Sequence, residues 1–152
     1  MKRVIALASV LICSCALWAG QPNAPDLQRR EGFTWAVDTT DHFVLHLEAG
    51  TRAAKRADLM GFEMDRARER ALDLLDENDY EPRINVFVVG SRSRMQKLVG
   101  RSIDGIAYSN TNVIALVLGD SVSGSPTHEV VHVMATSAWG LGPTWLNEGM
   151  SV

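Results

Sequence analysis

The stretch from Ile84 to Val89 constrains the fold more than any other part of the chain. Its sequence, Ile-Asn-Val-Phe-Val-Val, is apolar on both of the faces that alternate along a strand. A strand of this kind is typical of the interior of a sheet. We therefore expect it to have neighbouring strands and not to lie at an edge.

The segments before this strand predict a second strand and a long helix. Residues 42–48 alternate between apolar and polar, which predicts a half-buried strand. His42 and His46 lie on its polar side, where we expect solvent exposure in preference to a second metal site. Residues 51–77 carry apolar side chains at spacings of four and three, which predicts a helix with one buried face and a solvated face of Arg, Asp, Glu and Lys.

The segments after the strand at residues 84–89 predict a short helix, two more strands and a further helix. Ser91 can cap a short helix that stops at Gly100. Residues 106–108 and 113–118 predict two strands joined by a polar turn, and a further helix starts near Ser125 with proline at its first position. This order of elements predicts an α+β domain with helices packed against one mixed β-sheet.

The N-terminus predicts an export signal. Lys2 and Arg3 precede an apolar or small, uncharged run over residues 4–19. Two cleavage patterns stay open: a lipoprotein-type box in which Cys15 is lipidated, and ordinary cleavage just after the apolar run. An uncleaved N-terminal anchor is the third alternative. We expect an exported protein of the bacterial periplasm or cell envelope.

This interpretation divides the chain into three parts. Residues 1–20 are the signal peptide, residues 21–40 a tether and lead-in, and residues 41–152 the folded domain. The net charge of −3 provides no global basic field, which argues against nucleic-acid binding. We expect membrane contact only through an N-terminal lipid or an uncleaved signal.

The residues that carry chemistry lie in the last predicted helix, where His128-Glu129-Val130-Val131-His132 occurs. Histidines four residues apart share one helix face and can bind one metal ion. Two imidazole nitrogens supply half of the tetrahedral set that Zn²⁺ prefers. Glu129 lies about 100° further around the helix, where its carboxylate can act as general base without binding the metal. The alternative is a helix with two solvent-facing histidines.

A second motif, Trp-Leu-Asn-Glu-Gly-Met-Ser, follows at residues 145–151. Its Glu148 stands sixteen positions after His132, beyond a Gly/Pro break at which the chain can reverse. A carboxylate there can complete three protein ligands and leave the fourth zinc position for water. The alternative is an acid in the first turn of a helix, where it favours the helix dipole.

Together, the two motifs resemble those of the gluzincin metallopeptidases, in particular the bacterial peptidase-MA-like domains. The resemblance covers about residues 40–152. It implies that His128, His132 and Glu148 bind Zn²⁺ and that Glu129 is the catalytic base. It also implies a zincin-like N-terminal subdomain that hydrolyses a bond in a peptide or protein substrate with a zinc-activated water.

The resemblance further implies an edge strand along which an extended peptide aligns by β-addition. We expect this strand at residues 113–118, with the substrate contacts at Val113, Ile114, Ala115 and Leu116.

Gluzincins continue past the third ligand into a C-terminal subdomain, and only four residues follow Glu148 here. We therefore expect the domain to be truncated. The alternative function is a non-catalytic zinc-binding or structural module of the cell envelope on the same scaffold.

Overall fold

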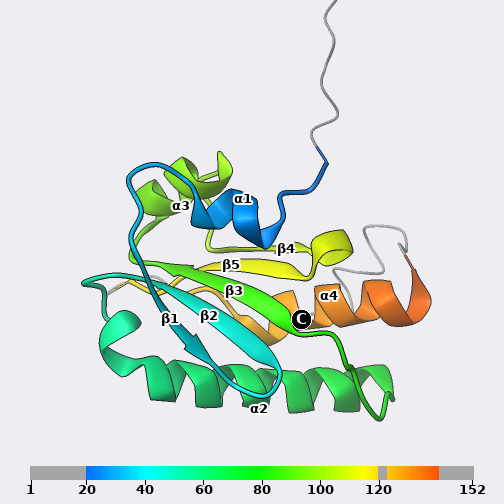
Figure 1. The fold of residues 1–152 in the computed structure, drawn as a ribbon. Helices are drawn as coiled ribbons and strands as arrows, with labels where there is room; N and C mark the ends of the chain where they lie inside the picture. Colours follow the sequence, from blue (N-terminus) through cyan, green and yellow to red (C-terminus); the bar gives the residue numbers. More distant parts are fainter. Residues whose placement is uncertain (1–19, 120–122, 141–152) are drawn as a thin grey trace, which may run out of the picture.

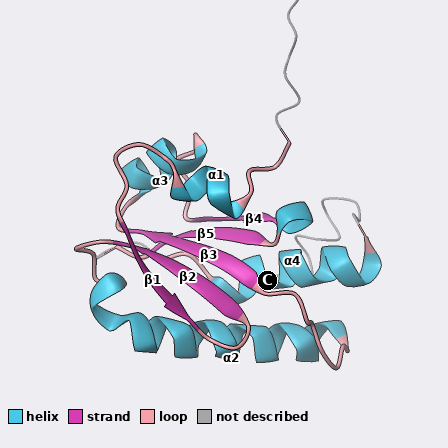
Figure 2. Ribbon diagram, viewed as in Figure 1, coloured by secondary structure: helices cyan, strands magenta, loops and turns pink. Residues whose placement is uncertain are grey.

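The structure, a computed structural model, describes residues 20–119 and 123–140. They form a five-stranded mixed β-sheet with helices on both faces (Figures 1 and 2). The strands are β1 (Trp35–Thr39), β2 (Phe43–Glu48), β3 (Ile84–Val89), β4 (Gly105–Tyr108) and β5 (Val113–Val117). The helices are α1 (Ala24–Gln28), α2 (Ala57–Leu75), α3 (Arg92–Val99) and α4 (Pro126–Trp139), with 3-10 turns η1 (Ala54–Arg56) and η2 (Ser109–Thr111). The predicted α+β class is confirmed.

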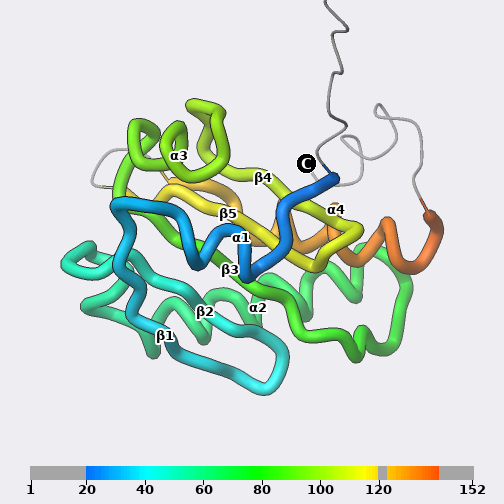
Figure 3. The backbone as a smooth tube through the Cα atoms, turned by 45° about the horizontal axis from the view of Figure 1, so that its top comes forward, coloured from blue at the N-terminus to red at the C-terminus, as the bar shows by residue number. Residues whose placement is uncertain are grey.

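The strand order is β1-β2-β3-β5-β4, so β3 occupies the centre, as its sequence predicts. The strands β2, β3 and β5 run parallel, whereas β1 and β4 run antiparallel to their neighbours at the two edges. The tube in Figure 3 shows the same arrangement from a second side. The helix α4, which contains the motif at residues 128–132, follows the internal strand β5 and contacts the edge strand β4. We call it the motif helix.

The sheet separates two hydrophobic cores. Phe43, Leu45 and Leu47 of β2 pack with α2 and α4 on one face and are fully buried. Phe87 and Val89 of β3 pack with α1 and α3 on the other face. Because alternate residues of a strand point to opposite faces, the parallel strands need apolar residues at nearly every position.

Local capping sets the ends of α3 as the sequence predicts. The Ser91 hydroxyl accepts the N–H of Arg94 at 3.3 Å, and the helix ends at Gly100, whose φ is 79°. Glycine adopts this left-handed conformation without the steric penalty that a Cβ brings. The predicted bounds of this helix are confirmed.

Residues 21–40, which the sequence analysis assigns to a tether and lead-in, contain regular structure. They contain α1 and β1, and β1 pairs antiparallel with β2 along its whole length. The Gln21 side-chain oxygen accepts the N–H of Asn110 at 3.0 Å, and the Pro22 carbonyl accepts the hydroxyl of Thr111 at 2.9 Å. The folded domain therefore begins before residue 41.

The polar face of β2 is also buried, contrary to the half-buried strand that its alternation predicts. His46 is 1% exposed and stacks on Phe87 with 4.3 Å between the ring centroids. The Gln28 amide donates to Nδ1 of His46 at 3.3 Å, and Nε2 donates to the Asn85 side-chain oxygen at 3.2 Å. These partners assign the neutral tautomer with its proton on Nε2. His46 is a structural residue of the second core.

Burial lowers the pKa of His46, and the hydrogen bond to Asn85 opposes part of that effect. As pH falls below about 6.5, the unfolded chain takes up a proton that the folded chain does not. We expect the free energy of unfolding to fall between about pH 6.5 and the lower pKa of the folded state. The fall should be about 1.4 kcal/mol for every tenfold difference between the acid dissociation constants of the two states. Urea unfolding at a series of pH values measures it.

The matched variants for this measurement are His46→Gln and His42→Gln. The first should flatten the decline with pH, because its side chain does not titrate, whereas the second should keep it. The same slope in the wild type and in His46→Gln would contradict the prediction.

The predicted signal peptide at residues 1–20, with Cys15, lies outside the described residues except for Gly20. Within residues 20–119 and 123–140, no helix has both the length and the apolar character that a bilayer-spanning segment needs.

Candidate functional site

The motif helix α4 is held by its N-terminal cap and by its packing. Pro126 occupies the first turn, and the Ser125 hydroxyl accepts the N–H of His128 at 3.4 Å. Serine as the cap and proline in the first turn both favour a helix start, so the predicted start is confirmed. The helix buries its apolar residues against α2 and the sheet: Val130, Val131, Val133, Met134 and Ala135. This packing fixes the position of the motif relative to the core.

His128 and His132 come together on one face of α4. Their Nε2 atoms are 3.1 Å apart, and their rings meet at 81° with 4.6 Å between centroids. Two nitrogens bound to one tetrahedral zinc ion at 2.0–2.1 Å would lie about 3.3 Å apart. The observed separation is therefore within a few tenths of an ångström of what a shared zinc ion requires. Both side chains are partly exposed, so an ion can reach them.

The backbone carbonyl of His132 is hydrogen-bonded to the turn between β4 and β5. The carbonyl of His132 accepts the hydroxyl of Ser109 in η2 at 3.0 Å and that of Thr136 at 2.9 Å. The bond from Ser109 joins α4 to the sheet edge at the level of the histidine pair. Ser109 could not be singled out from the sequence, because a serine in a polar turn normally faces solvent.

Glu129 lies between α4 and β4 and is 7% exposed. Its side chain occupies the space that a side chain at Gly105 would need. A Cβ atom placed on Gly105 would lie 3.0 Å from the carboxyl carbon of Glu129 and 3.1 Å from its Cγ. The predicted general base therefore contacts the backbone of an edge strand.

The prediction that residues 113–118 form the edge strand is wrong. β5 is internal, since it pairs with β3 on one side and with β4 on the other. Its predicted substrate-contacting residues are at most 2% exposed, and they are Val113, Ile114, Ala115 and Leu116. A strand that is apolar on both faces is typical of a sheet interior, and this signal was present in the sequence. The edge strand on this side of the sheet is β4.

The outer side of β4 can be deduced from its register. Val117 donates its N–H to the carbonyl of Asp104 at 2.8 Å, and Gly105 pairs with Leu116. Alternate residues of an antiparallel strand point their N–H and C=O groups to opposite edges, so those of Gly105 and Ala107 point away from β5. No strand of the described ranges pairs with this side. An outer sheet edge thus lies beside Glu129.

The predicted third ligand, Glu148, lies outside the described residues. Among residues 20–119 and 123–140, His, Cys, Asp and Glu side chains form no group of three that could hold a metal ion. The described residues therefore offer His128 and His132 as two nitrogen donors, and Glu148 stays a prediction.

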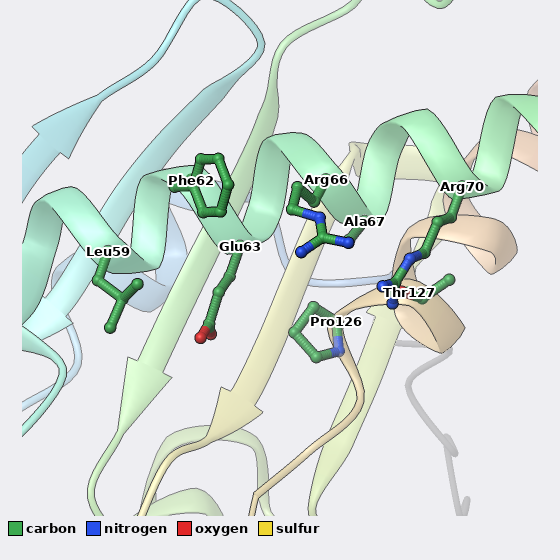
Figure 4. Close-up of a pocket in the computed structure, with 8 residues that line it drawn as sticks. All are labelled: Leu59, Phe62, Glu63, Arg66, Ala67, Arg70, Pro126 and Thr127. Carbon is green, nitrogen blue, oxygen red and sulfur yellow. The ribbon is translucent and has the colours of Figure 1, made fainter.

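A separate hollow of about 310 Å³ lies between α2 and the start of α4 (Figure 4). Its lining combines apolar side chains with charged groups: Leu59, Phe62, Glu63, Arg66, Ala67, Arg70, Pro126 and Thr127. Phe62 is 59% exposed, and the guanidinium carbon of Arg66 lies 5.9 Å from the centroid of its ring. None of the motif residues lines this hollow.

A scan against protein-family models and a search of curated proteins both find no match for this chain. The functional assignment therefore rests on the geometry of α4 and β4.

Proposed function

We propose that this chain is a zinc metallopeptidase domain of the gluzincin type, similar to the bacterial peptidase-MA-like domains. The observation that carries the proposal is the pair of Nε2 atoms of His128 and His132, 3.1 Å apart on a capped helix. The buried carboxylate of Glu129 beside the outer edge of β4 supports it.

In this proposal, His128 and His132 would hold the zinc ion, and Glu148 would be the third ligand. Zinc, when bound, polarises the scissile carbonyl and lowers the pKa of water toward neutrality. Glu129 accepts a proton from the attacking water on a carboxylate oxygen and passes it to the nitrogen of the leaving amine. The histidines would hold the ion, and Glu129 would move the proton.

The substrate is a peptide that extends the sheet at β4. An extended peptide would pair with the outward N–H and C=O groups of Gly105 and Ala107 by β-addition. This position replaces the one predicted on β5. It brings a peptide bond next to the carboxylate of Glu129, because that carboxylate lies against Gly105.

The mixed sheet with a long helix and a motif helix on one face is compatible with a zincin-like N-terminal subdomain. We extend the proposal to that fold and to an exported location. This part of the proposal includes the signal peptide, with lipidation of Cys15 and ordinary cleavage after the apolar run as its two alternatives.

The experiment is hydrolysis by the protein produced from its complete reading frame. We expect one zinc ion per chain and cleavage of casein or of a mixture of quenched fluorescent peptides. A chelator should abolish the cleavage, and added zinc should restore it, because the ion would polarise the scissile carbonyl and activate the water. Mass spectrometry of the products and metal analysis measure both. Stoichiometric zinc without cleavage would instead favour the non-catalytic envelope module.

A further inference from the structure

Gly105 occupies a strand position at which a side chain would normally stabilise the sheet. It is the first residue of β4 and pairs with Leu116 at the end of the β4–β5 ladder. Its φ is not positive, unlike those of Gly32, Gly50 and Gly100, so the backbone there does not require glycine. Glycine weakens a strand, and in such a position it marks the close approach of another group.

The approaching group is the side chain of Glu129. The three atoms nearest to a Cβ placed on Gly105 all belong to it: Oε1, the carboxyl carbon at 3.0 Å and Cγ at 3.1 Å. Glu129 is 7% exposed and follows a helix start fixed by a cap and a proline. The helix backbone that carries Glu129 is therefore fixed, whereas its carboxylate is the end of a side chain with rotatable bonds.

The backbone of β4 is restrained at this point. Arg92 of α3 binds both carboxylate oxygens of Asp104, with Nε and Nη2 each 2.5 Å from its partner. The carbonyl of Asp104 accepts the N–H of Val117, and a Cβ placed on Gly124 would lie 2.5 Å from the same carbonyl oxygen. A contact at Gly105 must therefore be relieved mainly by movement of Glu129.

We propose that Gly105 is a positioning residue, whose missing side chain sets the location of the Glu129 carboxylate against the outer edge of β4. This inference rests on the proposed function of Glu129 as general base. A general base takes a proton from a group whose heavy atom lies about 2.6–3.2 Å from its own acceptor atom. A methyl group at position 105 would push the carboxylate away from the peptide bond and leave His128 and His132 in place.

The first test is a double-mutant cycle in thermal stability with Gly105→Ala and Glu129→Ala. Gly105→Ala alone should lower Tm by about 3 to 8 °C, because it overpacks a restrained contact. In the Glu129→Ala background it should leave Tm unchanged or raise it, since all three contacting atoms are gone. Gly61→Ala is the control, because a Cβ there meets Thr40 and Leu45 and not Glu129, so its shift in Tm should be the same in both backgrounds. Additive shifts would overturn the proposal whatever the activity.

The second test separates positioning from packing. Gly105→Ala should lower kcat for the quenched fluorescent peptides at least about tenfold, with KM and zinc content unchanged, since a misplaced base affects proton transfer. Stability coupling with an unchanged kcat would overturn the positioning role. A wild-type protein that shows the coupling but cleaves nothing would overturn the catalytic role of both residues and leave only their contact. The two failures are thus distinguishable.

Discussion

Glu129→Gln is expected to hydrolyse peptides about a hundred- to ten-thousand-fold more slowly than the wild type while it binds zinc equally well. Glutamine has nearly the same shape as glutamate, so it can occupy the same space against Gly105. Its amide cannot accept and return a proton as a carboxylate does. His128 and His132, which we propose as ligands, are unchanged in this variant.

The measurement combines kcat/KM on quenched fluorescent peptides with metal content by mass spectrometry. Glu69→Gln is the matched control, since it neutralises an exposed carboxylate on α2. The control should keep full activity, which would exclude a general effect of charge. Hydrolysis by Glu129→Gln at the wild-type rate would show that the carboxylate is not the base. Loss of zinc in this variant would instead make Glu129 a ligand.

The sequence predicted those parts of the fold that depend on neighbouring residues. Apolar periodicity located β3, and serine followed by proline located the start of α4 at Pro126. The β4–β5 hairpin was also predicted, with its turn at residues 109–112. Each of these features depends on residues that lie close together in the sequence, so the local sequence pattern is sufficient to predict it.

The order of the strands could not be predicted in this way. β1 is a largely exposed edge strand, and α1 has five residues, so neither carries a strong apolar period. Both depend on partners distant in sequence, as in the pairing of β1 with β2. The expectation of an edge strand at residues 113–118 has a different origin: it comes from the family resemblance, whereas the apolar residues on both faces of β5 are typical of an internal strand.

The burial of polar groups also depends on residues distant in sequence and could not be predicted. Arg68 belongs to the face of α2 predicted to be solvated, yet it is 8% exposed. Its guanidinium binds the carboxylate of Asp79 and the carbonyl of Tyr80, which lie beyond the end of the helix. A charged side chain can be buried when such partners meet it, and only the folded chain brings them together.

In the candidate site too, the features that depend on neighbouring residues could be predicted and those that depend on distant residues could not. A spacing of four places His128 and His132 on one helix face in any context, so the pair was predictable. The contact of Glu129 with Gly105 depends on how α4 packs against β4, and the strand was expected to begin only at residue 106. The only sequence signal for this contact is Gly105 itself, a glycine directly before the strand predicted at residues 106–108.

His128→Ala and His132→Ala are each expected to weaken zinc binding by roughly a hundredfold or more, because each removes one of the three protein ligands that we propose. The effect can be measured as a change in Tm. Zinc at a thousand times its Kd stabilises the wild type by about 4 kcal/mol, which corresponds to roughly 10 °C for a domain of this size. Each histidine variant should lose most of this zinc-dependent rise, whatever its Tm without metal.

His42→Ala is the matched control, because it removes a histidine near the start of β2 and should keep the full rise with zinc. A histidine variant that also keeps the full rise would contradict the assignment of its side chain as a ligand. Competition with a chromophoric chelator provides an independent measure of the Kd.

Glu148→Ala separates the two interpretations of that carboxylate by the same measurement. If Glu148 is the third ligand, the variant should lose most of the zinc-dependent rise and keep its Tm without metal. If Glu148 is only an acid that favours a helix dipole, Tm should fall slightly and by the same amount with and without zinc. The ligand set is tested by the difference between the two Tm values, because that difference cancels any effect of a variant on the fold itself.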